Sequence, residues 1–377
     1  MALSAGERTR YHRHLNLPEF GAAGQERLKA ARILIVGTGG LGCPAALYLA
    51  AAGVGTLGLV DFDRVELSNL QRQVLFANDD VGRLKVEVAR ERLLALNPEV
   101  TVIAMALRLG AQNVCAVLKD YDIVLDGSDR LSTRYLISDA CVLLGKALVT
   151  AAIHRFEGQA MTYVPGQGPC YRCLFLQGPA DGIESCAEAG VLGVLPGVLG
   201  ALQASEAVKL ASGIGAPLLG RLLTYDALGM SFTELPVSRR AECPACGEHP
   251  SITVPEEIRG SCEAQASSAA QRLSAREVRE LMASCRTTGP GLRLIDVREP
   301  WEFHARHLDG ACNIPLGELE GRLGECAGEG PLVFICRSGQ RSLAACALAL
   351  RAGIASPGHL DGGLLAWSEQ IDPNFTL

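Results

Sequence analysis

The stretch ILIVGTGGLG, residues 33–42, decides the fold of the first part of the chain. Its four leading apolar residues predict a buried strand, and the glycines that follow predict a turn into a helix over residues 41–52. Glycines let the backbone approach phosphate groups, and the N-terminus of a helix offers free N–H groups to negative charge. Asp61 ends the next predicted strand, at the distance where an acidic residue can bond ribose hydroxyls. The stretch therefore predicts a nucleotide site, with an NAD-dependent dehydrogenase as the default interpretation.

Outward from this stretch, short β-branched runs alternate with helical segments as far as residue 151. The predicted strands are 33–36, 57–61, 123–126 and 147–151, and the predicted helices are 41–52, 86–96 and 131–144. This alternation is typical of parallel strands joined by crossover helices. The predicted fold class is α/β with a Rossmann-like, doubly wound sheet, and residues 192–212 are predicted to form a further buried helix.

Composition limits the classes of protein that remain. Of 377 residues, 48% are apolar and 20% are charged, which is a globular balance. The net charge is −6 and the basic residues are scattered, which argues against a nucleic-acid partner. Residues 41–60 carry no charge, but their proline and glycines favour a βαβ unit over a membrane span. Residues 1–14 lack the apolar core of a signal peptide. We therefore expect a cytoplasmic protein without a membrane partner.

The composition shifts after residue 247, where apolar periodicity is lost and Ser, Ala, Pro and Glu become frequent. From Leu273 a second α/β pattern begins, with predicted elements at 292–296, 333–336 and 341–352. About a hundred residues remain there, enough for one small domain. The expected organisation is a first domain at 1–247, a linker at 248–272 and a second domain at 273–377.

The residues that follow Asp61 do not suit a dehydrogenase. Arg72 and Lys85 are fixed cations, which suit a triphosphate better than a hydride acceptor. Asp126 and Asp129 lie at the carboxyl end of a predicted strand, the edge at which ligands bind in such sheets. A carboxylate there can hold Mg²⁺ beside substrate phosphates. A solvated charged loop explains any one of these residues, but it explains the set poorly.

Fourteen cysteines in a chain expected to be cytoplasmic are more often metal ligands, nucleophiles or core residues than disulfides. Most of them stand singly in apolar surroundings and are expected to be buried and inert. Two Cys-x-x-Cys pairs together supply four thiolates for a tetrahedral zinc, with a redox dithiol as the alternative. A closed four-thiolate site has no open position, so this zinc is expected to be structural. The four ligands would be Cys170, Cys173, Cys243 and Cys246.

Cys336 follows a predicted strand and precedes a predicted helix. Backbone N–H groups and a helix N-terminus at such a junction favour the thiolate form of a cysteine. Arg337 and Arg341 add positive charge, which is expected to attract a small anionic donor. The Cys-x4-Arg spacing is one residue shorter than the Cys-x5-Arg loop of tyrosine phosphatases, so it gives a tighter cradle that suits a sulfane sulfur better than a phosphate. The loop comprises Cys336, Arg337, Ser338, Gly339, Gln340 and Arg341.

The motifs of the first domain closely resemble those of the ubiquitin-activating-like adenylyltransferases, in particular the sulfur-carrier adenylyltransferases of the molybdopterin-synthase and thiamine pathways. The resemblance extends over about residues 8–247, and the residues that carry it are RYHRH (10–14), GTGGLG (37–42), DFD (61–63), SNLQRQ (68–73), Lys85 and the two cysteine pairs. It implies a homodimer that binds ATP and Mg²⁺. The implied nucleotide-binding residues are Gly37, Gly39, Gly40, Gly42, Asp61, Asp63, Ser68, Asn69, Arg72, Lys85, Asp129 and Arg130.

The resemblance also implies individual roles. Asn69, Arg72 and Lys85 would contact phosphates, Asp129 would bind Mg²⁺, and Arg13 would reach the phosphates bound by the partner subunit. Such proteins usually have Asn after this Asp, whereas Arg130 stands here. An arginine cannot copy an asparagine acceptor, so we expect rearranged metal or adenine contacts.

Cys186 lies in the segment ESCAEAG, residues 184–190. Taken alone it is an ordinary loop cysteine. The segment resembles the TC-x-EAG-type segment of the same adenylyltransferases, in which a cysteine on a mobile crossover loop forms a covalent link during sulfur transfer. The resemblance therefore implies such a role for Cys186.

Residues 273–371 strongly resemble single-domain rhodaneses. The resemblance is carried by DVREPWEF (296–303), His307, NIP (313–315), the Cys336 loop and DGG (361–363). It implies that Cys336 carries a persulfide. Asp296, Arg298 and His307 are expected to support the fold rather than to take part in the chemistry.

An adenylating domain and a sulfur-carrying domain on one chain suggest one pathway. ATP would activate the C-terminal glycine of a small ubiquitin-like sulfur carrier that ends in Gly-Gly, and the Cys336 persulfide would then attack the acyl-adenylate. Thiosulfate or a cysteine desulfurase would supply the sulfur. The residues expected to act in catalysis are Cys336, Cys186, Arg72, Lys85 and Arg13. The alternatives are a non-catalytic scaffold that docks sulfur carriers and an NAD-dependent oxidoreductase fused to a rhodanese.

Overall fold

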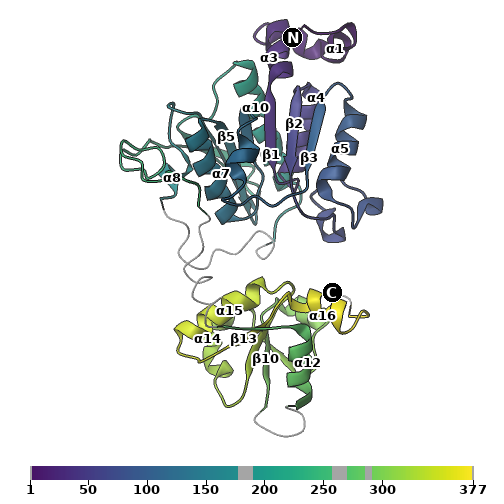
Figure 1. Ribbon diagram of the computed structural model, residues 1–377, viewed down its shortest axis with the longest axis vertical. Coiled ribbons are helices and arrows are strands. Elements are labelled where there is room, and N and C mark those ends of the chain that lie inside the picture. Colours follow the sequence, from purple (N-terminus) through teal and green to yellow (C-terminus); the bar gives the residue numbers. More distant parts are fainter. Residues whose placement is uncertain (1, 177–189, 257–269, 285–290, 376–377) are drawn as a thin grey trace. The chain divides into compact units, whose positions relative to one another are not determined.

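The computed structural model describes residues 2–176, 190–256, 270–284 and 291–375. In this part of the chain two compact units are present, the first made of residues 2–176 and 190–256 and the second of residues 270–284 and 291–375. Each unit is a helix-covered β-sheet (Figure 1). The predicted α/β fold class is confirmed.

The first unit contains an eight-stranded sheet in the order β3-β2-β1-β4-β5-β6-β7-β8. Its strands are β1 (Arg32–Val36), β2 (Thr56–Val60), β3 (Thr101–Met105), β4 (Ile123–Asp126), β5 (Ala147–His154), β6 (Glu157–Tyr163), β7 (Arg221–Asp226) and β8 (Ser231–Pro236). Its helices are α1 (Ala5–Arg10), α2 (His12–Leu15), α3 (Gly21–Ala30), α4 (Gly42–Ala52), α5 (Lys85–Leu96), α6 (Val114–Leu118), α7 (Leu131–Leu144), α8 (Tyr171–Leu174) and α10 (Leu195–Ser212). The long elements predicted from the sequence are therefore present, with ends that differ by a few residues.

Strand β1 is buried on both faces because its side chains alternate between two apolar cores. Ile33 and Ile35 pack in a core with residues of α3, α4, α5 and α10. Leu34 and Val36 pack in a second core with residues of α6 and α7. Helices therefore cover both faces of the sheet, as a doubly wound topology requires (Figure 1).

The strands predicted from the sequence as far as residue 151 pair in parallel, as expected, and the complete sheet is mixed because it contains three further antiparallel strands that were not predicted. Strands β1 to β5 pair in parallel, whereas β6, β7 and β8 extend the sheet in antiparallel fashion from β5. Every residue of β8 is exposed, so this strand has no buried apolar alternation from which it could be predicted.

The second unit contains a five-stranded parallel sheet in the order β11-β10-β12-β13-β9. Its strands are β9 (Gln271–Leu273), β10 (Arg293–Asp296), β11 (Ala311–Asn313), β12 (Leu332–Ile335) and β13 (Gly358–Leu360), and its helices are α12 (Ala275–Ser284), α13 (Pro300–Ala305), α14 (Leu316–Arg322), α15 (Gln340–Arg351) and α16 (Gly363–Gln370). Residues of α14 and α15 pack in a core on one face of the sheet, and residues of α12 and α16 pack in a core on the other. The predicted small α/β domain is thus a helix–sheet–helix sandwich (Figure 1).

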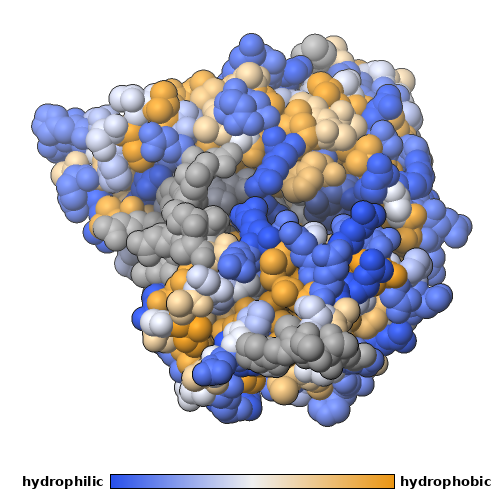
Figure 2. Space-filling view, turned by 60° about the horizontal axis from the view of Figure 1, so that its bottom comes forward, coloured by the Kyte–Doolittle hydropathy of each residue, from blue (hydrophilic) through white to orange (hydrophobic). Residues whose placement is uncertain are grey.

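The surface and the helices agree with the composition. Hydrophilic and hydrophobic residues are interspersed over the face shown in Figure 2. Residues 41–60, the longest uncharged run considered above, form α4 and β2. Within the described ranges, no helix combines the length and the apolar character needed to cross a bilayer.

A buried ion pair fixes α8 to α7. The Arg172 guanidinium donates two hydrogen bonds of 2.7 Å to the Asp139 carboxylate, and it also lies 4.8 Å from the centre of the Tyr135 ring. The side chains of Arg172 and Asp139 are only 10% and 1% exposed. Removing one partner of such a pair leaves an uncompensated charge out of water, and this costs more than the pair contributes.

We expect Asp139→Asn to lower the free energy of unfolding of the first unit by about 3–5 kcal/mol, because the substitution keeps the shape but leaves the Arg172 charge buried without its counter-ion. Urea unfolding at neutral pH measures this difference. Glu234→Gln is the matched control, because Glu234 pairs with Arg221 at the surface and such pairs contribute about 0–1 kcal/mol. Equal effects of the two substitutions would contradict the interpretation.

Candidate functional site

The glycine turn after β1 is set by a close approach of backbone to backbone. Gly37 has a φ of +88°, a conformation that favours glycine. A Cβ atom on Gly42 would lie 1.9 Å from the carbonyl oxygen of Gly37, so this position excludes every other residue. Gly37, Gly39 and Gly40 line a cavity at the carboxyl ends of β1, β2 and β4, whereas Gly42 is buried at the start of α4 and shapes the turn from beneath.

Asp61, directly after β2, joins this turn to the next strand. Its carboxylate accepts hydrogen bonds from the backbone N–H and the hydroxyl of Thr38, at 2.8 and 3.0 Å, and from the backbone N–H of Asp63 at 2.9 Å. Both Asp61 and Asp63 line the cavity. The acidic side chain is therefore held rigidly at the position that the dinucleotide-type fingerprint predicts.

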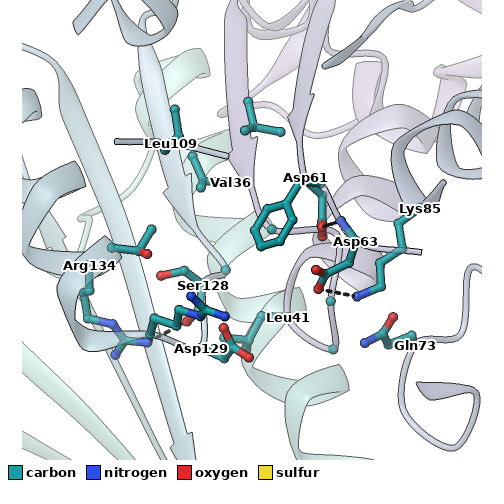
Figure 3. A pocket seen from close by; sticks show the side chains of 18 of the residues that line it. Val36, Leu41, Asp61, Asp63, Gln73, Lys85, Leu109, Ser128, Asp129 and Arg134 are labelled. Carbon is teal, nitrogen blue, oxygen red and sulfur yellow. Dashed lines mark hydrogen bonds and ion pairs between the residues drawn. The ribbon is translucent and has the colours of Figure 1, made fainter. Parts of the chain in front are cut away.

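Two cations reach the same cavity from other segments. Lys85, the first residue of α5, is only 7% exposed and pairs with Asp63 at 3.1 Å. Arg72 donates to the carbonyl oxygen of Ser68 at 3.1 Å and lines the cavity. Figure 3 shows Asp61, Asp63 and Lys85 together on one side of the cavity. A cavity with a glycine turn, a rigid carboxylate and two cations suits a phosphorylated nucleotide.

Ser68, Asn69 and Arg13 do not line this cavity. The Asn69 side chain is buried and accepts a hydrogen bond from the backbone N–H of Glu66 at 3.3 Å, so it shapes the turn that carries Arg72. Ser68 donates to the Glu66 carboxylate at 3.1 Å. Arg13 is exposed on α2. Their predicted phosphate contacts remain predictions.

The two aspartates at the end of β4 have different surroundings. Asp126 is fully buried, where its carboxylate accepts hydrogen bonds from Ser128 and Thr150 and pairs with Arg134 at 3.3 Å. Asp129 is exposed and lines the cavity (Figure 3). Its neighbour Arg130 is also exposed and lines the cavity. Of the two aspartates, Asp129 lines the cavity, so its carboxylate is the one that could hold a metal there, whereas Asp126 is enclosed.

The structure adds residues that the sequence analysis did not select. Gln73 is 4% exposed and lines the cavity, and its Oε1 atom has no hydrogen-bond partner among the described residues. A buried amide oxygen without a partner is uncommon in proteins and is consistent with a ligand or water that completes the site. Gln73 is the last residue of the motif SNLQRQ, so this motif could have identified it as a candidate site residue. The apolar lining comes from Val36, Leu41, Val60, Phe62, Leu107, Leu109, Ile153 and Val191.

The four cysteines of the two Cys-x-x-Cys pairs meet at one point. Their sulfur atoms all lie within 4.8 Å of one another, and three of the separations are 4.0, 3.5 and 3.4 Å. A tetrahedral zinc with Zn–S bonds of about 2.3 Å separates its sulfurs by about 3.8 Å. Neighbouring backbone supports the cluster, because the N–H of Arg240 points at the Cys173 sulfur at 3.5 Å. The residues present therefore fit a closed, structural metal site.

The Cys336 loop of the second unit surrounds a buried sulfur. Cys336 is 1% exposed, and its Sγ atom accepts hydrogen bonds from the backbone N–H groups of Gly339 at 3.1 Å and Ser342 at 3.3 Å. The carbonyl oxygens of Cys336 and Arg337 accept hydrogen bonds from the first turn of α16, from Leu364 and Leu365. The loop is thus held from both sides, with the sulfur at the N-terminus of α15.

The two arginines of the Cys336 loop differ in their ion pairing. The sequence predicted that both would attract an anionic donor, and the structure distinguishes between them. Arg341 makes two hydrogen bonds, of 2.7 and 2.9 Å, with the Glu302 carboxylate on α13, so its charge is compensated inside the unit. Arg337 is half-buried and forms no ion pair with any described residue. Arg337, rather than both arginines together, is therefore the loop cation available to an anionic donor.

Asp296, Arg298 and His307 lie in structural positions. Arg298 pairs with Asp296 at 2.7 Å in the buried core of the second unit and donates to the carbonyl oxygen of Arg306. His307 stacks on Phe303 with ring centres 4.0 Å apart. These contacts agree with the expected role as fold supports. Cys186 lies outside the described residues.

The Glu302–Arg341 pair generates a prediction about pH. Burial opposes ionisation of Glu302, but the hydrogen bonds and the charge of Arg341, together with the backbone N–H of Glu299 and the charge of Arg298, outweigh burial and hold the pKa of Glu302 below its ordinary value. A carboxyl with a lowered pKa contributes stability above its ordinary pKa, and that stability is lost as the pH falls through the lowered value. Glu302→Gln should therefore lower the free energy of unfolding of the second unit by about 1.5–3 kcal/mol at pH 7 and by much less in acid.

Urea unfolding between pH 3 and pH 7 checks this prediction. Glu318→Gln is the control, because Glu318 forms an exposed pair with Arg322 on α14. A Glu302→Gln effect that does not change with pH would show that the pairing is not its cause.

Comparison with known proteins agrees with both sites. Residues 11–245 match the ThiF family and residues 274–370 match the rhodanese-like domain. The chain is 44% identical to the probable adenylyltransferase/sulfurtransferase MoeZ of Mycobacterium tuberculosis, over 100% of this chain and 96% of that protein. It is 43% identical to the adenylyltransferase and sulfurtransferase MOCS3 of Sus scrofa, over 99% of this chain and 88% of that protein.

Two further similarities concern the first unit. The chain is 54% identical to the sulfur carrier protein adenylyltransferase of Thermus thermophilus, over 65% of this chain and 92% of that protein. The crystal structure of Escherichia coli MccB with ATP superposes with a TM-score of 0.55 at 26% identity, over 65% of this chain and 76% of that chain. The resemblances inferred from the motifs are confirmed: this chain belongs to the ThiF family and continues into a rhodanese-like domain.

Proposed function

We propose that the protein adenylates the C-terminal glycine of a small ubiquitin-like sulfur carrier and then converts it to a thiocarboxylate with sulfur carried by Cys336. The observation that carries the proposal is the cavity of the first unit, where the glycine turn, Asp61, Arg72, Lys85 and Asp129 converge. A hydride-transfer enzyme needs no such set of cations, whereas a reaction that releases pyrophosphate does. The names of the similar proteins, adenylyltransferase and sulfurtransferase, support the same two activities.

In the adenylation step, the carrier carboxylate attacks the α-phosphate of ATP and pyrophosphate leaves. The backbone N–H groups of the glycine turn would receive the phosphates, and Asp61 would accept from the ribose hydroxyls. Arg72 and Lys85 would stabilise the negative charge that develops on the transferred phosphate. Magnesium, held with Asp129, would offset phosphate charge when bound. Arg130 lines the same edge of the cavity, where its charge would bear on the metal or adenine contacts.

In the sulfur-transfer step, the terminal sulfur of the Cys336 persulfide attacks the carbonyl carbon of the acyl-adenylate. A carbon–sulfur bond forms, the carbon–oxygen bond to AMP breaks, and an acyl disulfide to Cys336 results. The thiolate of Cys186 would then attack the Cys336 sulfur and release the carrier thiocarboxylate. The Cys186–Cys336 disulfide left behind requires a thiol reductant before the next cycle.

The remaining features follow from the same proposal. The four-cysteine cluster would hold a structural zinc, and the protein would act in the cytoplasm as a homodimer in which Arg13 reaches the phosphates bound by the partner subunit. Thiosulfate or the persulfide of a cysteine desulfurase would load Cys336. Since Glu302 compensates Arg341, Arg337 is the side chain that would receive the anionic donor.

Lys85→Ala and Cys336→Ser should separate the two half-reactions. ATP–pyrophosphate exchange, measured with Mg²⁺ and a panel of Gly-Gly-ended carriers, should fall about 100-fold or more in Lys85→Ala, because a preorganised charge on the phosphates is lost. Sulfur loading of Cys336 should remain in that variant. Cys336→Ser should keep full exchange and form no thiocarboxylate.

Arg90→Ala, an exposed cation on α5, is the control for the loss of positive charge. No exchange with a carrier that binds tightly would contradict the enzyme and favour a docking scaffold. An unchanged thiocarboxylate yield in Cys336→Ser would show that the second unit does not supply the sulfur.

The purified protein should contain one zinc per chain, and Cys173→Ser should lose it. Burial raises the pKa of the Cys173 thiol to about 11, and a bound metal would oppose this by holding the sulfur as a thiolate at neutral pH. Metal analysis by mass spectrometry and the unfolding midpoint with and without chelator check the prediction. Cys115→Ser is the control, because Cys115 is only partly buried and lies outside the cluster. Full zinc content in Cys173→Ser would contradict the four-cysteine site.

A further inference from the structure

The sulfur of Cys336 occupies the place of a helix cap. The residue before α15 is Gly339, which has no side chain to accept from the free N–H groups of the first helical turn. The Cys336 sulfur accepts these hydrogen bonds instead, from Gly339 and Ser342. Backbone donors of this kind favour negative charge on the sulfur, but they are common to any cysteine placed at such a junction.

The Ser342 side chain adds a hydroxyl group beside the backbone donors. Its hydroxyl oxygen lies 3.5 Å from the Cys336 sulfur and 3.0 Å from the carbonyl oxygen of Gly339, to which the hydroxyl donates. That carbonyl also accepts the helical N–H of Leu343 at 3.1 Å. The hydroxyl hydrogen can therefore turn from the carbonyl to the sulfur without leaving a buried acceptor unpaired.

A buried histidine stands behind the serine. The Nδ1 atom of His359, on β13, lies 3.5 Å from the Ser342 hydroxyl oxygen, and Ser342 and His359 are 0% and 2% exposed. Burial lowers the pKa of His359, so the imidazole is neutral at neutral pH. Among the described residues its Nε2 atom has no hydrogen-bond partner. A neutral ring carries one N–H, and Nδ1 is the position at which that hydrogen has an acceptor, the oxygen of Ser342.

We propose that Ser342 is a catalytic residue of the second unit and that His359 is its positioning residue. The Nδ1–H of His359 would donate to the Ser342 oxygen, which directs the hydroxyl hydrogen to the Cys336 sulfur whenever that sulfur is a thiolate. The inference rests on the proposed function, because the thiolate is the form that attacks a sulfur donor. With thiosulfate, the Cys336 thiolate forms a bond to the outer sulfur, the sulfur–sulfur bond of thiosulfate breaks, and sulfite leaves with its electron pair.

Few charged groups lie near the contacts that join Cys336, Ser342 and His359. Arg337 belongs to the loop, Arg341 is paired with Glu302, and Asp361 and Arg272 act on His359 with opposite signs. The hydroxyl of Ser342 is therefore a short-range donor whose removal changes no net charge. Its effect on the thiolate can be measured separately from that of the arginines.

The test is the pH dependence of alkylation of Cys336 by iodoacetamide in the full-length protein, followed by mass spectrometry of the Cys336 peptide. Ser342→Ala should move the midpoint upward by about one pH unit, which is about a tenfold change in the acid dissociation constant of the thiol. His359→Ala should move it in the same direction by less, and Ser342→Thr, which keeps the hydroxyl, should restore the wild-type midpoint. Ser368→Ala on α16 is the matched control and should leave it unchanged.

Unshifted midpoints in Ser342→Ala and His359→Ala would overturn the proposal. This holds even if both variants were less stable to urea, because a loss of stability without a shift would indicate a purely structural role. If Ser342→Ala did not fold, an unshifted midpoint in His359→Ala would overturn it. Sulfur uptake from thiosulfate is measured on the same samples. A wild-type Cys336 that is alkylated normally but takes up no sulfur would contradict the proposed function while leaving the Ser342 inference standing.

Discussion

The nucleotide cavity depends on the contact between two backbone turns. The turn after β1 and the turn after β4 approach so closely that a Cβ atom on Gly37 would lie 2.8 Å from the carbonyl oxygen of Gly127. A side chain at Gly42 would collide with the carbonyl oxygen of Gly37. Because both turns leave the carboxyl edge of the same parallel sheet, this contact brings the glycine turn, Asp61 and Asp129 around one space. Any larger residue at these glycines would separate the segments that make the cavity.

Helix α7 couples this cavity to the cysteine cluster. Arg134, on its first turn, is buried against Asp126 and donates to the carbonyl oxygen of Ser128, so it holds the loop that ends in Asp129. One turn further on, Asp139 pairs with Arg172, which lies between the first two cysteines of the cluster. Two buried ion pairs on one helix thus connect the four-cysteine cluster with the cavity of the first unit. Because buried pairs tolerate little displacement, α7 is a rigid support for both.

In both units, the start of a helix lies beside the place where negative charge is expected. In the first unit, Gly39, Gly40 and Leu41, directly before α4, line the cavity in which phosphates would lie. In the second unit, the first turn of α15 donates directly to the Cys336 sulfur. The side chains around the two helix starts differ. Arg72 and Lys85 line the first cavity, whereas Ser342 lies beside the Cys336 sulfur, with His359 next to it and with Arg337 and the paired Arg341 in the same loop.

The sequence by itself determined the α/β class, the long helices and strands, the glycine turn, the four-cysteine pairing and the Cys336 loop. These features can be predicted because each depends on residues that are close together in the chain or that recur at a fixed spacing. The conformation of such short segments is set mainly by their own residues. The antiparallel strands β6 to β8 were not predictable in this way, because the exposed residues of β8 carry no apolar pattern.

Only the tertiary structure decided which polar groups are paired and which remain available. Arg341 and Glu302 are 39 residues apart, and Ser342 and His359 are 17 apart. Asp126 and Asp129 look equivalent in the sequence, yet one is enclosed and the other faces the cavity. A charge or a hydroxyl acts according to the partner that packing places beside it, and packing joins residues whose distance along the chain carries no signal.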